Sequence, residues 1–274
     1  MKKIDIHTHT TNRPVPGVVS NSCSVEYLQK KMKEHDVVKS VVLASYFPHK
    51  TSGISNFRLY TWIRDKPEFS LFGSLDFEHY FFQGMNELTE LGDMGKLDGV
   101  KIYTGYQNID LNGNKLKEVV KLAHKYEVPM TFHCGYSHSA LRKYGKPAIT
   151  DLVGPKDLEF LARENPEVKF LAAHMAKPFL DEIIEVTKQN PNVYTDMSGL
   201  MHSGPENKEL PRVTEEVKKY LEQAGPDKLM FGTDFPVQTH EDSIYIVENA
   251  MQGFSENDKK KVYYDNARRF LENE

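Results

Sequence analysis

The chain has 274 residues, of which 27% are charged, and its formal net charge is −4 at pH 7. It contains no basic block, so nothing in the charge pattern indicates nucleic-acid binding. No apolar run approaches the ~18 residues of a membrane span, and the basic Met1-Lys2-Lys3 is not followed by the apolar core of a signal peptide. The two cysteines, Cys23 and Cys134, fit a reduced compartment better than a disulfide framework. These features predict a cytoplasmic globular protein.

The first predicted element is a short strand over Ile4–His9, because the branched residues Ile4 and Ile6 alternate with polar ones. The strand ends in two histidines, His7 and His9. In an extended chain, residues i and i+2 project to the same side, roughly 6.5 to 7 Å apart. Two imidazoles placed in this way can converge on one metal ion. A catalytic zinc takes about three protein ligands, so the pair indicates further ligands along the chain.

Seven more apolar, strand-like runs follow, separated by segments with helical periodicity. The predicted strands are Ser40–Ser45, Phe69–Asp76, Gly99–Tyr103, Met130–Cys134, Val168–His174, Asn192–Asp196 and Lys228–Asp234. The predicted helices are Val25–Asp36, Asn56–Trp62, Phe82–Leu91, Asn114–Tyr126, Lys156–Glu164, Pro178–Lys188, Arg212–Gln223, Glu241–Met251 and Glu256–Leu271. This alternation predicts an α/β fold in which eight parallel strands close into a (β/α)8 TIM barrel. No linker divides residues 1–274, so a single domain is expected.

Side chains suited to metal binding or catalysis stand at the predicted carboxyl ends of five strands. They are His7, His9, Lys101, His133, His174 and Asp234. Each one alone is more simply explained as a hydrogen-bonded polar group at the edge of the core. The active site of this barrel, however, lies at the carboxyl ends of its strands. Together these residues would therefore supply the donors of a metal site at one place.

The order of these residues resembles the amidohydrolase superfamily. The features that carry the resemblance are His7-Thr8-His9 after the first strand, His133 after the fifth, His174 after the sixth, and Gly232-Thr233-Asp234-Phe235-Pro236 after the eighth. The closing run 266–271 is similar to the tail of the amidohydrolase-related branch. That branch includes aminocarboxymuconate semialdehyde decarboxylase, other decarboxylases and lactone hydrolases. The resemblance covers essentially the whole chain and is specific to the superfamily, not to a substrate.

The resemblance implies one bound divalent metal ion, usually zinc. Its ligands would be His7, His9, His133 and Asp234. Asp234 would also accept a proton from the metal-bound water, whose pKa coordination lowers toward ~7. His174 would hydrogen-bond this water or the substrate.

Lys101 leaves the number of metal ions open. In two-metal members of the superfamily a carboxylated lysine after the fourth strand bridges the ions, and the sixth-strand histidine, here His174, binds the second ion. In related one-metal members a lysine in a Gly-Val-Lys-Ile run need not bridge. One ion is favoured here, because the tail and the run around Asp234 are typical of the branch that mostly uses one.

Other residues near the strand ends are candidates for the substrate pocket. Tyr103 follows the fourth strand, and Lys101 is a candidate if it does not bridge metals. Arg142 lies in the long loop Gly135–Pro155, and its guanidinium would suit a substrate carboxylate as a bidentate donor. Cys134 adjoins His133 and is expected to point away from the site into the packing.

The leading hypothesis is a metal-dependent hydrolase that cleaves an amide, ester or lactone of a small molecule with a metal-activated water. The alternative is a non-oxidative, metal-dependent decarboxylase of a small carboxylic acid, because both reactions share the fold and the ligands. A barrel that binds a ligand without chemistry is a third hypothesis, and the complete ligand set argues against it. The expected partner is a small-molecule substrate; the oligomeric state stays open, and a homodimer is compatible with the sequence.

Overall fold

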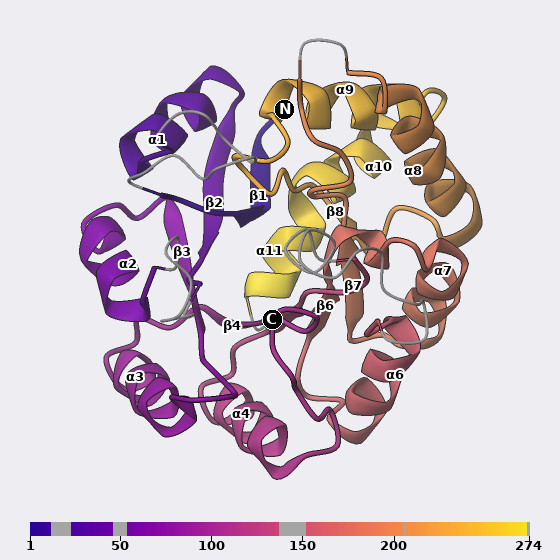
Figure 1. Cartoon of the computed structure of the whole chain (residues 1–274). Coiled ribbons are helices and arrows are strands. Elements are labelled where there is room, and N and C mark those ends of the chain that lie inside the picture. The colour runs from indigo at the N-terminus through magenta and orange to yellow at the C-terminus, as the bar shows by residue number, and fades with distance from the viewer. Residues whose placement is uncertain (12–22, 46–53, 137–151, 205–206, 273–274) are drawn as a thin grey trace.

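Eight parallel strands in sequential order form the centre of the protein, and helices form a ring around them (Figure 1). The computed structural model describes residues 1–11, 23–45, 54–136, 152–204 and 207–272. The strands are β1 (Lys3–Thr8), β2 (Val37–Leu43), β3 (Phe69–Ser74), β4 (Gly99–Ile102), β5 (Met130–Phe132), β6 (Phe170–Ala172), β7 (Val193–Asp196) and β8 (Leu229–Met230). The predicted (β/α)8 barrel is therefore confirmed.

The helices of the ring follow the strands in turn. They are α1 (Val25–Glu34), α2 (Asn56–Ile63), α3 (Phe81–Asp93), α4 (Asn114–Lys125), α6 (Pro155–Glu164), α7 (Leu180–Gln189), α8 (Leu210–Ala224) and α9 (His240–Ala250). Each buries one apolar face; α4, for example, buries Leu116, Val119 and Ala123. Within the described ranges, no helix has the length and apolar character needed to cross a membrane.

Backbone hydrogen bonds between β1 and the segment after β8 close the barrel. The N–H of Ile6 donates to the carbonyl of Phe231 at 3.1 Å, and the N–H of Asp234 donates to the carbonyl of His7 at 2.8 Å. One step further, the N–H of His9 donates to the carbonyl of Phe235 at 2.7 Å. The closure therefore fixes the backbones of His7, His9 and Asp234 beside one another.

The amino-terminal end of the barrel is covered by the last helix, α11 (Asn266–Leu271), which lies across the middle of the ring in Figure 1. Its Ala267 and Phe270 are buried in an apolar cluster with residues from six strands. The strand residues of this cluster are Ile4, Ile6, Val41, Leu43, Phe72, Leu171, Tyr194 and Met230. The side-chain amide of Asn266 donates to the carbonyls of Pro226 and Leu229 at 2.6 and 2.7 Å. The helix is thus fastened to the ends of the strands opposite to the predicted site.

Most predicted elements are shifted by one to a few residues at one or both ends, and three of the differences concern the site or the last helix. The sixth strand ends at Ala172, and His174 lies in the following turn η2 (Ala173–Ala176), where it has φ 62°. The eighth strand ends at Met230, and the residues after it, which hydrogen-bond to β1, include Asp234 with φ 54°. The predicted helix Glu256–Leu271 is divided into α10 (Glu256–Lys260), the π-helical turn η3 (Lys261–Asp265) and α11. The wider π turn keeps Val262 and Tyr263 buried against the barrel.

Candidate metal centre

Three of the predicted metal ligands converge at the carboxyl end of the barrel. The Nε2 atoms of His7 and His9 lie 3.5 Å and 3.1 Å from Oδ1 of Asp234. Two ligand atoms bound at 2.0–2.1 Å to one tetrahedral ion are about 3.4 Å apart, so this spacing fits a shared ion. The side chain of His7 is 1% exposed and that of His9 is 25% exposed, so the group is open to solvent on the His9 side.

His133 and His174 form a second pair beside this group. The Nδ1 of His133 lies 3.2 Å from the Nε2 of His174, and the rings of His174 and His7 are 4.7 Å apart. Backbone carbonyls fix the protons of the pair: Ser198 O lies 2.8 Å from Nδ1 of His174, and Tyr136 O lies 3.1 Å from Nε2 of His133. Because a carbonyl only accepts, these two nitrogens carry the protons. The nitrogens that face each other then both present lone pairs, an arrangement suited to a cation.

The protonation states support the same interpretation. Burial lowers the pKa of His7 to about 3 and also lowers the pKa values of His133 and His174, so all three rings are neutral near pH 7. Burial by itself would raise the pKa of Asp234, but the hydrogen bond from His9 and the nearby His7 outweigh it and hold the pKa well below its usual range. Neutral imidazoles and an ionised carboxylate are the forms that bind metal.

Lys101, at the end of β4, is a buried cation without a hydrogen-bond partner in the described parts of the chain. Its residue is 1% exposed, and burial lowers the pKa of its amine to about 8. The amine lies 5.3 Å from the ring centroid of Tyr103. The hydroxyl of Tyr103 donates to the carbonyl of Ala44 at 2.8 Å, so its proton is not directed at Lys101. The ring of Tyr103 lies 6.4 Å from the ring of His9. A buried amine of this kind is ready to bind an anion.

Arg142, the other predicted substrate-binding residue, lies outside the described residues. Cys134 is buried in the apolar core, and burial raises the pKa of its thiol. Its burial in this core agrees with the expectation that Cys134 takes part in packing.

Asp196, the last residue of β7, also belongs to the site, although it was not among the predicted site residues. Its Oδ2 lies 2.9 Å from Nδ1 of His7, and its Oδ1 accepts the backbone N–H of His174 at 2.9 Å. Burial would raise the pKa of Asp196, but its contacts with His7, His174 and Ser198 outweigh burial and keep it ionised. A signal was present, because Asp196 ends a predicted strand just as Asp234 does, and the same strand-end rule applies to both.

The backbone around the site adopts conformations that most residues avoid. His174 and Asp234 have φ values of 62° and 54°. Gly199, with φ 58°, packs against both: a Cβ added there would lie 2.7 Å from Oδ2 of Asp234 and 3.0 Å from Nδ1 of His174. Left-handed non-glycine residues cost of order 1–3 kcal/mol each and are concentrated at functional sites. The local geometry is therefore maintained against this cost by the surrounding fold.

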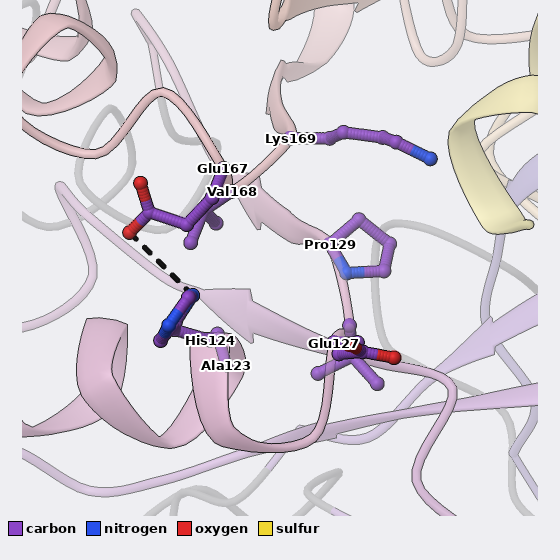
Figure 2. Close-up of a pocket in the computed structure, with 8 residues that line it drawn as sticks. Ala123, His124, Glu127, Pro129, Glu167, Val168 and Lys169 are labelled. Carbon is purple, nitrogen blue, oxygen red and sulfur yellow. Dashed lines mark ion pairs between the residues drawn. The ribbon is translucent and has the colours of Figure 1, made fainter. Parts of the chain in front are cut away.

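A separate cavity of 130 Å³ lies at the opposite end of the barrel, beside the starts of β5 and β6 (Figure 2). Its lining residues are Ala123, His124, Glu127, Val128, Pro129, Glu167, Val168 and Lys169. His124 and Glu167 form an ion pair at 3.6 Å, and Lys169 extends away from that pair toward α11. Among the described residues, none of the clusters of potential metal ligands involves this lining. The cavity is therefore not a second candidate centre.

Comparison with known proteins identifies the family. The amidohydrolase family model matches residues 59–272, which is more than half of the chain, so the protein belongs to the amidohydrolase family. No curated protein matches the chain significantly. The superfamily predicted from the sequence is thereby confirmed, and the chain is an enzyme of that superfamily.

Several solved structures share the whole fold. An amidohydrolase from Burkholderia multivorans with bound zinc is 15% identical, with a TM-score of 0.72 and 99% of each chain covered. A probable 2-pyrone-4,6-dicarboxylic acid hydrolase from Acinetobacter baumannii, with citric acid bound, is 15% identical, with a TM-score of 0.67 and 99% coverage of each chain. The 5-carboxyvanillate decarboxylase from Sphingomonas paucimobilis is 14% identical, with a TM-score of 0.68 and 98% coverage of each chain. Hydrolases and decarboxylases thus both occur on this fold.

Proposed function

We propose that this protein is a hydrolase that cleaves an amide, ester or lactone of a small molecule and depends on a single divalent ion, most simply zinc. The observation that carries the proposal is the convergence of His7, His9 and Asp234. The Nε2 atoms of the two histidines lie 3.5 and 3.1 Å from Oδ1 of Asp234. Imidazole nitrogens and one carboxylate are a donor set that suits zinc. His133 would be the further ligand, with His174 beside it.

A bound divalent ion would polarise a substrate carbonyl and lower the pKa of a water molecule toward ~7. The chain's own residues would then move the protons. Asp234, held ionised, accepts a proton from the attacking water, whose oxygen bonds to the carbonyl carbon. As the bond to the leaving oxygen or nitrogen breaks, Asp234 returns the proton to the leaving group. His174, whose Nε2 is an acceptor in this tautomer, holds the water by a hydrogen bond.

Lys101 supports a substrate that carries a carboxylate. Its buried amine has no hydrogen-bond partner in the described ranges, and an anionic group would supply one. The ring of Tyr103 would form one wall beside that group, and Arg142 would be a second cationic contact. Two of the structural neighbours are named for carboxylated substrates, a pyrone dicarboxylic acid and carboxyvanillate, which agrees with this class.

The same observation favours a decarboxylase as the second candidate. A carboxylate drawn to Lys101 would be buried near the metal ligands, and loss of carbon dioxide would remove its charge from a poorly solvated place. The carbon would then take up a proton, which Asp234 or His174 is placed to donate after receiving it from water. Hydrolysis is the first candidate because Asp234 can act as the base for water. Decarboxylation would in addition require a substrate that stabilises a carbanion.

The proposal also includes a cytoplasmic location. Neither Cys23 nor Cys134 is in a disulfide, and both are buried. Reduced cysteines are the usual state in the cytosol.

Turnover in 18O-labelled water distinguishes the two reactions. The zinc-loaded protein would be incubated with small carboxylated lactones, esters and amides and, separately, with hydroxylated aromatic acids, and products would be analysed by mass spectrometry. Hydrolysis places one 18O atom in the new carboxylate, whereas decarboxylation releases carbon dioxide and leaves a product one carboxyl group lighter. His7→Ala is the matched negative control. Equal turnover by wild type and His7→Ala would contradict both candidates.

A further inference from the structure

Asp196 connects the two histidines that come from β1 and from the turn after β6. Its Oδ1 accepts three donors: the N–H of His174 at 2.9 Å, the N–H of Ser198 at 3.0 Å and the hydroxyl of Ser198 at 2.6 Å. Its Oδ2 lies 2.9 Å from Nδ1 of His7, its one hydrogen-bond partner among the described residues. The carboxylate is fully buried. Its two oxygens therefore have different partners.

The contact with His7 decides which ring nitrogen carries the proton. An ionised carboxylate can only accept, so Nδ1 of His7 is the donor. The lone pair of the neutral ring is then on Nε2, the atom that lies 3.5 Å from Oδ1 of Asp234. The opposite tautomer would place an N–H where a metal ion needs a lone pair. A carboxylate behind a ligating histidine has this orienting effect in many metal sites.

Asp196 also acts on His174 through the backbone. Its Oδ1 holds the N–H of His174, a residue with φ 62°, and the N–H of Ser198. The carbonyl of Ser198 in turn accepts the Nδ1 proton of His174 at 2.8 Å. The carboxylate of Asp196 thus fixes the Nδ1 proton of His7 directly. It also holds the backbone of His174 and Ser198, between which the Nδ1 proton of His174 is shared.

We propose that Asp196 is a positioning residue that sets His7 as the Nδ1–H tautomer, so that its Nε2 is available to the metal before any ion arrives. The proposal rests on the metal site of the proposed function but not on the reaction that the enzyme catalyses. It assigns to Asp196 no contact with metal or substrate. Its effect is on the proton of His7 and, through that proton, on the affinity of the centre for zinc.

The substitution Asp196→Asn tests this directly. Three donors surround the Oδ1 position, so the amide oxygen must take that side and the amide NH2 must face His7. The NH2 group donates to Nδ1 of His7 and drives its proton to Nε2. Long-range 1H–15N spectra of the metal-free protein should therefore show the Nδ1–H tautomer of His7 in the wild type and the Nε2–H tautomer in the variant. The affinity for zinc, measured by competition with a chelator, should fall about 10- to 100-fold.

Ser198→Ala is the matched control, because it removes one donor from Oδ1 and leaves both the charge and the contact with His7. It should keep the Nδ1–H tautomer and most of the zinc affinity. If Asp196 acted only through its charge, Asp196→Asn would weaken zinc binding and leave the tautomer unchanged, which would overturn the proposal. If the Asn variant did not fold, the wild-type spectrum alone would decide, since an Nε2–H His7 in metal-free wild type contradicts it. Neither measurement uses turnover, so failure of the proposed reaction would be seen separately.

Discussion

The two ends of the barrel differ in whether their lysine amines have hydrogen-bond acceptors among the described residues. At the amino-terminal end, Lys3 is buried, but its amine donates to the carbonyls of Met1 and His35 at 3.0 and 2.9 Å. Lys169 likewise donates to the carbonyls of Arg269 and Glu272, both at 2.6 Å, next to the apolar cluster under α11. At the carboxyl end, Lys101 is buried at the end of its strand and has no hydrogen-bond partner among the described residues.

This difference separates stability from function along the same strands. At the amino-terminal end the amines of Lys3 and Lys169 have acceptors and aromatic rings are buried, so this end contributes to folding. The carboxyl end holds neutral histidines with facing lone pairs and, in the described parts of the chain, a lysine without a hydrogen-bond partner, both of which cost free energy in the absence of ligand. Substitutions at the two ends should therefore change different measured quantities.

The largest effect is expected on metal content. Asp234→Ala or His7→Ala removes a ligand, and the former also removes its charge, so each variant should retain little or no zinc after dialysis, whereas the wild type retains about one ion per chain. Circular dichroism should show that each variant is folded, and His7→Ala should melt below metal-free wild type, because it leaves the buried Oδ2 of Asp196 without its partner. Asp227→Ala, which removes a surface carboxylate at the other end, is the control and should keep its metal. Full zinc occupancy in both site variants, measured by elemental analysis, would refute the assignment.

Phe270→Ala, at the amino-terminal end of the barrel, is expected to lower stability and to leave the metal content unchanged. Phe270 is 0% exposed, and its ring lies 5.3 Å from that of Tyr194. The cavity should lower the free energy of unfolding by about 3–5 kcal/mol, as measured by denaturant titration of the metal-free protein. Zinc content of the folded protein should not change. Phe82→Ala, at a residue that is 79% exposed, should change stability by less than about 0.5 kcal/mol. Loss of zinc from folded Phe270→Ala would show that the two ends are coupled.

The barrel was predictable from the sequence because its signals are local. Apolar strand runs and amphipathic helices such as α4 depend on neighbouring residues, and their alternation admits few topologies. The strand-end rule also selected His7, His9 and Asp234, since parallel strands bring their carboxyl ends together whatever the loops do.

What the sequence did not predict depends on contacts between distant segments. Asp196 acquires its role only when β7 lies beside β6 and when its carboxylate meets His7 of β1. These two residues are 189 positions apart in the chain. The left-handed turns at His174 and Asp234 likewise depend on hydrogen bonds to other strands. Neither residue type favours φ > 0 strongly enough for the sequence to predict these turns. The π turn before α11 has the same origin, since its residues pack on the barrel.

The smallest effect, and the sharpest test of the comparison, concerns Lys101. Lys101→Met keeps the length of the side chain and removes the buried charge, so it should stabilise the metal-free protein. Burial lowers the pKa of Lys101 from 10.5 to about 8, which corresponds to at most about 3 kcal/mol. Because the folded pKa is the lower one, the unfolded chain binds more protons between pH 8 and 10.5, and wild-type stability rises with pH in that window. The advantage of Lys101→Met should therefore be greatest below pH 8 and shrink toward pH 10.5.

The same variant decides between one metal ion and two. If Lys101 is an anion-binding residue beside a single ion, Lys101→Met should keep about one zinc per chain, gain stability and lose activity toward carboxylated substrates. If Lys101 is carboxylated and bridges two ions that also use His174, the variant should fall from about two ions toward one or none, and bicarbonate should aid reconstitution of the wild type. Lys228→Met, which removes an amine over the ring of Tyr194 at the opposite end, controls for general effects of losing a lysine. Anomalous scattering at the zinc edge gives the independent measurement: two peaks about 3.5–4 Å apart would contradict the single-ion centre, and Lys101 would then be a metal ligand rather than a substrate contact.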